Sequence, residues 1–182
     1  MAEFQNTIDL FGDKVVAASV TDKTIEEYDD NVITTIATHA FYQCKALASV
    51  NLPNVKSIGE FAFYECSKLA SVSIPSATII VDNSFRGCSL MTSLDMQNLT
   101  EIGTSAFVDC TKLNTLVLRG ETVCTLSNTN ALSGTPFAAG KDGGTVYVPQ
   151  ALITEYQNAT NWSTLYAAGT CNFVAIEGSE YE

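Results

Sequence analysis

Hydrophobic residues between positions 33 and 119 recur with a constant period of 22 along the chain. Six positions of each repeat are apolar in all four copies, with no insertion or deletion between them. These positions are Ile36, Ile58, Ile80 and Ile102; Phe41, Phe63, Phe85 and Phe107; Cys44, Cys66, Cys88 and Cys110; Leu47, Leu69, Met91 and Leu113; Val50, Val72, Leu94 and Leu116; and Leu52, Ile74, Met96 and Leu118. A fixed period of this length predicts a solenoid of stacked repeats.

Two kinds of local structure are predicted within each repeat. Val50 and Leu52 alternate with polar residues, which indicates a short strand with one buried face. The run from Ala40 to Cys44 predicts a single turn of helix or a tight turn. Because a strand and one turn cannot bury their apolar residues alone, neighbouring repeats must stack on one another. We therefore expect an α/β fold, a right-handed solenoid with short strands and single helical turns, capped at both ends, with the four Phe side chains stacked inside.

We expect residues 1–182 to form one domain, with four regular repeats at 33–119 and an N-terminal cap at 1–32. Several apolar residues of this cap fit either a short amphipathic helix or a pair of strands: Ile8, Leu10, Phe11, Val15, Val16 and Val20. Ile25 and Tyr28 lie one period before Leu47 and Val50, so a degenerate repeat is predicted there.

A degenerate fifth repeat is predicted at 120–149. Phe137 follows Phe107 by eight positions more than one period, which indicates an insertion of that length near 126–135. Val146 and Val148 then follow Phe137 as Val50 and Leu52 follow Phe41. We expect a C-terminal cap at 150–182, made of a helix at about 150–159, Trp162 over the open end of the solenoid and a last strand at 173–176. The acidic tail 177–182 is predicted to be solvated.

The second repeat, VKSIGEFAFYECSKLASVSIP, resembles the BspA-type leucine-rich repeat family, whose repeats run Ile-Gly-x-x-Ala-Phe-x-x-Cys-x-x-Leu-x-x-Val-x-Leu-Pro. The third repeat departs from that pattern at Val81 and Gln97. Val55, Ala77 and Leu99 replace the Asn or Cys that follows the strand in common leucine-rich repeats, which argues against a buried Asn ladder. The resemblance implies a surface-displayed role in recognition or adhesion, without an active site or a cofactor.

The net charge of −11 is concentrated at the two ends of the chain. Residues 33–119 carry six acidic and six basic side chains, whereas 1–32 and 120–182 have net charges of −6 and −5. No basic patch is present to displace counterions, so a nucleic-acid partner is not expected. The start MAEFQNTIDL lacks the pattern of a signal peptide, and no apolar stretch is long enough to span a membrane.

Four of the six cysteines occupy one position of the repeat. A thiol packs well beside Phe in a core, and side chains that point the same way from stacked strands have poor geometry for a bridge. We predict buried free thiols at Cys44, Cys66, Cys88 and Cys110. The spacing of these cysteines does not fit a zinc site, and the spacing of the acidic residues Asp82, Asp95, Glu101 and Asp109 does not fit a calcium loop.

The position after each Phe is the best candidate for a binding surface. It is predicted to face outward and holds Tyr42, Tyr64 and Arg86, and Tyr and Arg are common at binding hot spots. His39 and Phe61 lie one short turn away. His39 is the only histidine, and without an orienting partner it does not make a nucleophilic site with Cys44. The alternative is that these are ordinary exposed side chains.

The outward face of the strands is the rival surface, with small polar residues suited to hydrogen bonding. Its two columns hold Ser49, Ser71, Ser93 and Thr115, and Asn51, Ser73, Asp95 and Val117. We expect a non-enzymatic binding module, a monomer or part of a larger assembly, that recognises a protein or a glycan at a cell surface or outside the cell. The alternative is a structural or receptor-binding component of a phage virion.

Overall fold

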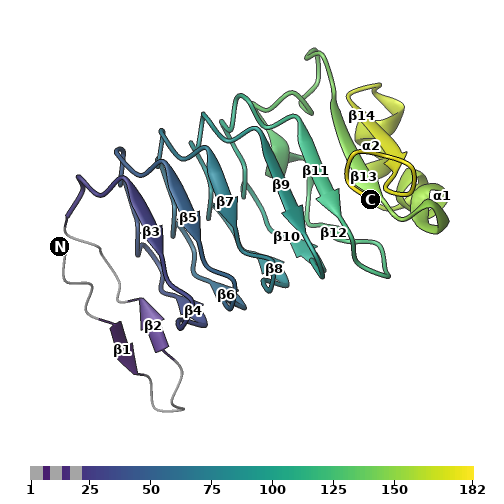
Figure 1. Ribbon diagram of the computed structural model, residues 1–182. Helices are drawn as coiled ribbons and strands as arrows, with labels where there is room; N and C mark the ends of the chain where they lie inside the picture. The colour runs from purple at the N-terminus through teal and green to yellow at the C-terminus, as the bar shows by residue number, and fades with distance from the viewer. Residues whose placement is uncertain (1–5, 9–13, 17–21) are drawn as a thin grey trace.

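The computed structural model describes residues 6–8, 14–16 and 22–182 and is an elongated stack of repeats (Figure 1). Each regular repeat contributes one strand to each of two rows. The first row contains β3 (Glu27–Asp29), β5 (Ser49–Asn51), β7 (Ser71–Ser73), β9 (Ser93–Met96), β11 (Thr115–Leu118), β13 (Gly144–Val148) and β14 (Cys171–Ala175). They form two sheets, in the orders β3-β5-β7 and β14-β13-β11-β9. All pairings in this row are parallel.

The second row was not predicted and runs through the Ile positions of the repeats. It contains β4 (Thr35–Ile36), β6 (Ser57–Ile58), β8 (Ile79–Ile80), β10 (Glu101–Ile102) and β12 (Thr125–Leu126). β1 (Asn6–Ile8) and β2 (Lys14–Val16) form an antiparallel pair, and β2 extends this row by parallel pairing with β4. Of the two alternatives for the N-terminal segment, the strand pair is therefore correct, while Leu10, Phe11 and Val20 lie outside the described residues.

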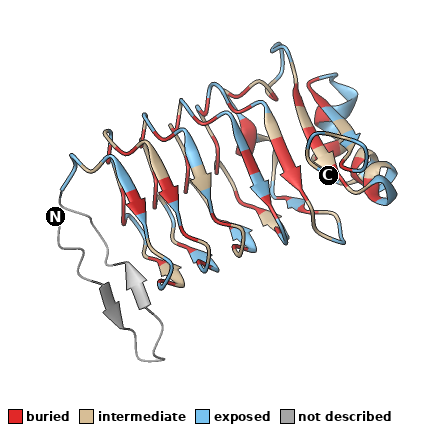
Figure 2. Ribbon diagram, in the orientation of Figure 1, coloured by how far each residue is buried: buried red, intermediate tan, exposed pale blue. Residues whose placement is uncertain are grey.

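The core fills the space between the two rows of strands (Figure 2). All four side chains of the Phe column are fully buried, which confirms their predicted position. Their rings stack from repeat to repeat with centroid distances of 5.1, 5.0 and 5.7 Å. Burial of each ring stabilises the fold by about 1.5–3 kcal/mol, most of which is offset by chain entropy. The ring of Tyr28 contacts Phe41 at the N-terminal end of this stack. Its strand β3 pairs with β5 in the register predicted for a degenerate first repeat.

The cysteines are free and buried, as predicted for the four in the repeats. Three of them tie neighbouring repeats together: the thiols of Cys66, Cys88 and Cys110 donate to the carbonyl oxygen of the Phe in the preceding repeat, over 3.1 to 3.2 Å. A thiol in this position therefore satisfies a buried carbonyl as well as filling space.

Between the two strands of a repeat, the chain makes two successive tight turns. In the first repeat, Ala40 N donates to Ala37 O and Tyr42 N donates to His39 O. The turns do not continue into a helix because residues in them have positive φ. The alternative of a tight turn, offered by the sequence for the run from Ala40 to Cys44, is the one adopted.

In the fifth repeat, the predicted equivalent of the Phe column is wrong. Leu132, not Phe137, occupies the position that Phe107 occupies in the fourth repeat. Phe107 N donates to Ala131 O over 2.9 Å, the same bond that each earlier Phe makes with the residue before the next Phe. Phe137 is still fully buried, and its ring lies where a side chain on Gly144 would otherwise stand.

The extra residues of this repeat are therefore not inserted at one place. Ile102 pairs with Leu126, two positions beyond the regular period, so the first addition precedes β12. Leu132 lies three positions beyond the regular period from Phe107, which adds one more around the 3-10 helix η1 (Thr129–Leu132). Leu116 pairs with Val146, eight positions beyond the regular period, so the remaining five precede β13. Each addition lies in a connection, and the strands keep their predicted register.

The helix predicted at about 150–159 in the C-terminal cap is present, and a second short helix that was not predicted follows it. A 3-10 helix η2 (Gln150–Leu152) leads into α1 (Ile153–Asn158), and α2 (Trp162–Ala167) follows. Trp162 is fully buried at the end of the second row, as its predicted capping role requires. Its indole Nε1 donates to Cys124 O over 2.7 Å, and Cys124 N donates to Tyr156 Oη over 2.8 Å. These side chains cover the outer edge at β12, which would otherwise be open to pairing.

Candidate binding surface

The structure brings all five predicted surface residues into one cluster on the turns of the first three repeats. We call this cluster, made of His39, Tyr42, Phe61, Tyr64 and Arg86, the aromatic patch. Tyr42 and Tyr64 stack with a centroid distance of 5.0 Å and an interplanar angle of 4°. The guanidinium of Arg86 lies over the other face of Tyr64, 5.9 Å from its centroid. The three side chains thus form a short column along the solenoid.

His39 and Phe61 form a second column beside the first. Their rings stack with a centroid distance of 5.1 Å and an angle of 5°. Tilted contacts join the two columns, with 5.3 Å between His39 and Tyr42 and 5.7 Å between Phe61 and Tyr64. His39 is exposed and the other members are half-buried. The patch therefore presents a continuous, partly open aromatic surface held by ring contacts.

Backbone conformation sets this second column apart. His39 and Phe61 have φ of 61° and 55°, in the left-handed region. Asn83 and Ser105 take the same place in the next two repeats, with φ of 57°. Asn, Asp and His are enriched in this conformation, whereas it is unusual for a bulky residue such as Phe. The sequence contains a hint of this conformation, since Asn and Ser occupy the equivalent positions of the next two repeats. The positive φ itself is evident only from the structure.

Polar side chains border the patch. Lys23 Nζ donates to Tyr42 O over 2.6 Å and lies 3.7 Å from the thiol of Cys44. Gln43 Nε2 donates to Glu65 Oε2 over 2.8 Å, and Lys45 Nζ lies 4.0 Å from the same oxygen. The charges around the patch thus include both signs.

The geometry does not assemble a nucleophilic site at His39. Its ring contacts Phe61 and Tyr42, whereas the Cys44 thiol is fully buried and contacts Lys23. Burial raises the pKa of Cys44, and the nearby Lys23 opposes that shift only in part. Among the described residues, no group of three or more His, Cys, Asp or Glu side chains is placed to hold a metal ion.

The rival strand face is open over its first repeats and covered over its last ones. Ser71, Ser73 and Ser93 are exposed as predicted, but Val117, predicted to face solvent, is fully buried. Val117 pairs with Asp95 on one side and Tyr147 on the other. The reason for its burial is the C-terminal tail, which crosses this face.

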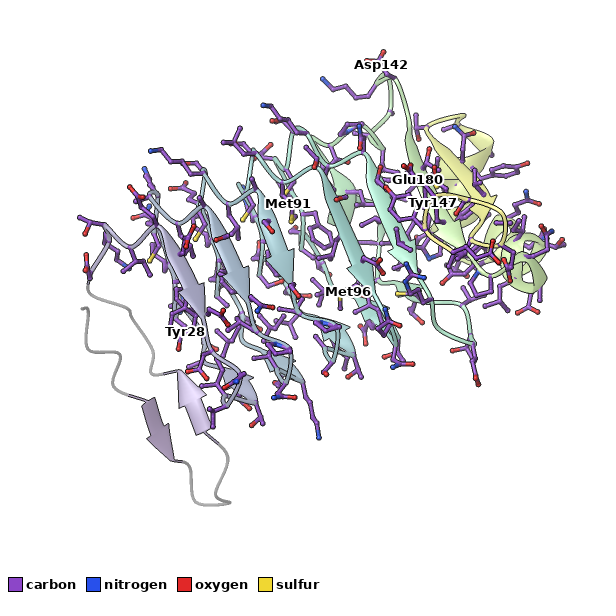
Figure 3. All side chains as sticks on the ribbon, in the orientation of Figure 1. Tyr28, Met91, Met96, Asp142, Tyr147 and Glu180 are labelled. Carbon is purple, nitrogen blue, oxygen red and sulfur yellow. The ribbon has the colours of Figure 1, made fainter. Side chains whose placement is uncertain are left out.

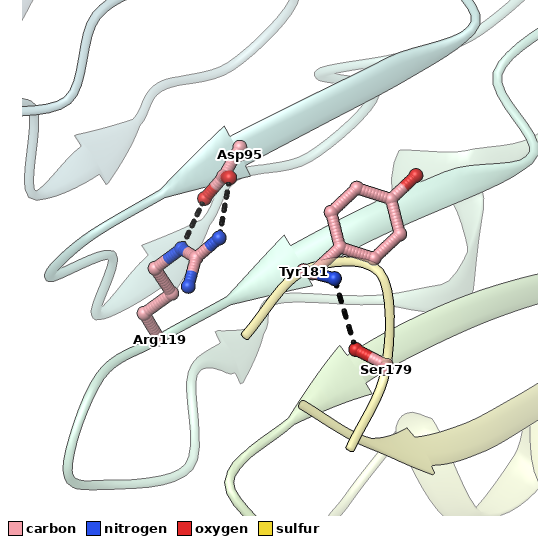
Figure 4. Close-up of polar contacts among 4 residues, drawn as sticks. All are labelled: Asp95, Arg119, Ser179 and Tyr181. Atoms are coloured by element: carbon pink, nitrogen blue, oxygen red, sulfur yellow. Dashed lines mark hydrogen bonds and ion pairs between the residues drawn. The ribbon is translucent and has the colours of Figure 1, made fainter. Parts of the chain in front are cut away.

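The acidic residues Glu177, Glu180 and Glu182 of the tail are exposed, as predicted, but Tyr181 between them is half-buried. The ring of Tyr181 packs against that of Tyr147 in a tilted arrangement, at a centroid distance of 4.6 Å, and Figure 3 labels Tyr147 at the C-terminal end of the solenoid. Next to them, Arg119 makes a two-bond ion pair with Asp95, over 2.7 and 2.9 Å (Figure 4). Tyr181 N donates to Ser179 Oγ, which holds the tail in a tight turn. These contacts leave only the N-terminal half of the strand face open.

Comparison with known families matches residues 20–135 to six copies of the BspA type leucine rich repeat region. The chain belongs to the BspA-type leucine-rich repeat family. Membership confirms the resemblance of the repeats, and leucine-rich repeats of this kind are generally non-enzymatic binding or surface modules. A search of curated proteins found no match to this BspA-type chain.

Several solved structures share the fold of this BspA-type chain. A leucine rich cell surface protein from Faecalibacterium prausnitzii A2-165 is 27% identical, with a TM-score of 0.62, and the match covers 71% of this chain and 35% of that protein. The leucine rich repeat protein TpLRR of T. pallidum is 25% identical, with a TM-score of 0.66, over 79% of this chain and 68% of that protein. The pneumococcal vaccine antigen PcpA, 15% identical with a TM-score of 0.58, matches over 88% of this chain and 44% of its own and supports the fold alone.

The chain thus spans about a third of the length of the Faecalibacterium protein. Within the described part of the chain, none of the helices has the length and apolar character needed to cross a lipid bilayer.

Proposed function

We propose that this chain is a non-enzymatic recognition module that binds a protein partner through the aromatic patch. The observation that carries the proposal is the left-handed backbone at Phe61, a bulky residue within the patch. Such a conformation costs a residue other than Gly or Asn about 1–2 kcal/mol. Strained residues of this kind cluster at functional sites. The aromatic side chain of Phe61 is therefore better explained by recognition than by stability.

The stacking favours a protein over a glycan. A sugar ring binds an aromatic side chain by placing its C–H groups on the negatively charged ring face. Tyr64 has Tyr42 over one face and Arg86 over the other, and Phe61 is stacked on His39. Ring edges, hydroxyl groups and the guanidinium remain for contact. Protein interfaces use Tyr and Arg in this way at their hot spots.

We further propose that recognition takes place at a bacterial cell surface, as part of adhesion. The similarity to a leucine rich cell surface protein supports this location over a virion. The patch is fixed by ring contacts on stacked repeats, so we expect its backbone to change little when the partner binds.

The test is a triple variant, Tyr42→Ala with Tyr64→Ala and Arg86→Ala, screened beside the wild type against arrays of host-surface proteins and of glycans. Because these side chains lie on the surface, we expect the free energy of unfolding to change by less than about 0.5 kcal/mol for each. Truncation of a hot-spot residue weakens binding by about 1–4 kcal/mol, so binding to the protein array should be lost.

The matched control changes the open strand face, with Ser49→Gln, Ser71→Gln and Ser93→Gln. This variant should bind as the wild type does. Loss of binding in the control with retention in the triple Ala variant would assign recognition to the strand face. Binding of the wild type to glycans alone would refute the choice of a protein partner.

A further inference from the structure

The two rows of strands are both interrupted between the second and third repeats. The first row changes sheet between β7 and β9, and the second row changes sheet between β6 and β8. The other neighbouring repeats are joined in both rows. A bond next to the second row is missing at the same junction. His39 N donates to Glu60 O, and Asn83 N donates to Thr104 O. The equivalent Phe61 N has no such bond to the third repeat among the described residues.

One residue accounts for the interruption of the second row. Gly59 and Gly103 follow the second-row strands of the second and fourth repeats, and a Cβ on either would clash with backbone atoms of the preceding repeat. Their N–H groups donate to carbonyl oxygens of that repeat over 2.8 and 2.7 Å. Val81 takes this place in the third repeat, and its N–H has no such bond within the described residues. The Cβ of Val81 therefore holds the third repeat away from the second. Ser127 keeps the bond in the irregular fifth repeat, where the connection that follows is one residue longer.

The first row is open at the same junction. Leu52 N donates to Ser73 O over 2.8 Å and joins the first repeat to the second. The equivalent Ile74 N has no bond to the third repeat in the described part of the chain. Val72, at the centre of β7, is only half-buried, whereas its equivalents in the other three regular repeats are buried. The missing ladder thus leaves a core position of the second repeat partly open.

Contacts across this junction persist at the turns. Phe63 N donates to Ser84 O over 2.8 Å, and Glu65 N donates to Arg86 O over 2.7 Å. The thiol of Cys88 donates to Phe63 O over 3.2 Å, and the rings of the Phe column still stack across the junction at a centroid distance of 5.0 Å. The turns therefore hold together two stacks that the strands do not join.

We propose that the junction between the second and third repeats is a hinge. The described residues up to 78 form one stack, residues 79–182 form the other, and the two bend about the turns at 61–67 and 83–89. Bending widens the gaps between the strands on the side away from the turns. Because every other junction is joined in both rows, the motion is concentrated at this one place, as in other hinges where a few connecting residues absorb the change.

The aromatic patch lies at the axis of the hinge. Four of its side chains belong to the N-terminal stack, and Arg86 alone belongs to the other. The bond from Glu65 N to Arg86 O keeps Arg86 beside Tyr64, so bending changes the tilt of the guanidinium over the ring rather than its neighbour. A partner that contacts both side chains would favour one hinge angle, since it binds that angle best. This consequence rests on the proposed function, whereas the hinge itself does not.

The first test measures amide hydrogen exchange residue by residue, by NMR and without any ligand. Thr100 N and Gly103 N donate across their junction, so the amides of Thr78 and Val81 should exchange faster than those two, after correction for intrinsic rates. Val81→Gly removes the obstructing Cβ and should slow exchange at Thr78 and residue 81 by about ten-fold or more, because a bonded amide must first open. Gly103→Val should do the reverse and speed exchange at Thr100.

Val108→Gly is the matched control for this test. It makes the same substitution at a half-buried position on the turn of the fourth repeat. Exchange at Thr78 and Val81 should stay as in the wild type. Equal protection of Val81 and Gly103 in the wild type would contradict the interruption. Unchanged exchange at Thr78 in Val81→Gly would show that Val81 is not its cause.

The second test measures bending with pairs of spin labels. The native cysteines are buried, so the labels attach to introduced ones. Val32→Cys with Glu121→Cys places labels on exposed connections after β3 and β11, away from the turns. Lys45→Cys with Lys112→Cys places them beside the turns, across the same junction. The distance distribution should be broad for the first pair and narrow for the second, and Val81→Gly should narrow the first. Equally narrow distributions for both pairs in the wild type would refute the hinge.

Discussion

All four cysteines of the repeats occupy the same place, and Cys66, Cys88 and Cys110 make the same bond there. The Phe of the preceding repeat leaves a carbonyl oxygen buried in the core, and the thiol donates to it. In the fifth repeat, Thr135 takes the place of the thiol, and its Oγ1 donates to Leu132 O of its own repeat over 2.6 Å. The link between neighbouring repeats is then lost, where the repeat itself becomes irregular.

The buried thiols make stability sensitive to alkaline pH. Desolvation raises the pKa of Cys66, Cys110, Cys124 and Cys171 from 9.0 to about 12. Between these two values, the unfolded chain releases thiol protons that the native chain retains, so the free energy of unfolding falls as pH rises. Below the lower value, the contribution of the thiols to stability is fully present. Each thiol should remove about 1.4 kcal/mol per pH unit within the window.

Urea titrations on both sides of the ordinary thiol pKa measure this slope. Because other groups also titrate there, the comparison is with Cys66→Ala, which is less stable at neutral pH but should lose stability more slowly with rising pH. Equal slopes for the wild type and this variant would contradict the raised pKa of Cys66.

Prediction from sequence succeeds at the residues whose environment is set by the neighbouring repeat. The Phe and Cys columns are buried because an equivalent residue lies directly above and below each of them. The same reasoning placed His39 beside Phe61 and Tyr42 beside Tyr64. It did not reveal the left-handed backbone of the second column, because φ is set by turns that apolar periodicity does not report.

At the scale of elements, local patterns fail where elements are short. The second-row strands are two residues long in the regular repeats, too short for any alternation. The helix α2 has no side-chain cap, and Asn161 before it has a positive φ, so the usual start signals are missing. Tyr181 packs against Tyr147, the neighbour of Val117 in the next strand, and such a contact between segments far apart in sequence is not encoded by any local pattern.

The cap at β12 gives a prediction at this scale. Trp162→Phe should leave Cys124 O without a partner, and Tyr156→Phe should do the same for Cys124 N. A buried polar group that loses its hydrogen bond costs about 1–3 kcal/mol. Denaturant midpoints should fall accordingly for both variants.

Tyr166→Phe is the matched control for these cap variants. It removes a hydroxyl from the same cap, on a side chain that is 42% exposed. Its free energy of unfolding should stay within about 0.5 kcal/mol of the wild type. If all three variants lost the same free energy of unfolding, the hydrogen bonds to the backbone of Cys124 would not be what stabilises the cap.

On the scale of the whole molecule, the aromatic patch and the C-terminal cap lie in different parts of the stack. The patch belongs to the first three regular repeats, and β14 is the last strand of the chain. Contacts made by the patch therefore do not involve the cap.

The backbone ladders also decide how the molecule would respond to a pulling force. Most strands in both rows pair with the equivalent strands of the next repeat, so their hydrogen bonds run along the long axis of the stack; the ladders are interrupted between β6 and β8 and between β7 and β9. A force applied between the two ends would act equally on every pair of neighbouring repeats, and the weakest pair would separate first, since each repeat contacts only its neighbours.

Stretching in optical tweezers should therefore extend the chain in steps. An extended chain spans about 3.3–3.6 Å per residue, so release of one regular repeat should give a step of about 75 Å. Opening in a single step would mean that the repeats fail together. A stack that peels repeat by repeat would yield at low force and recoil when the load is released, so that a tether built from it gives way gradually rather than breaking.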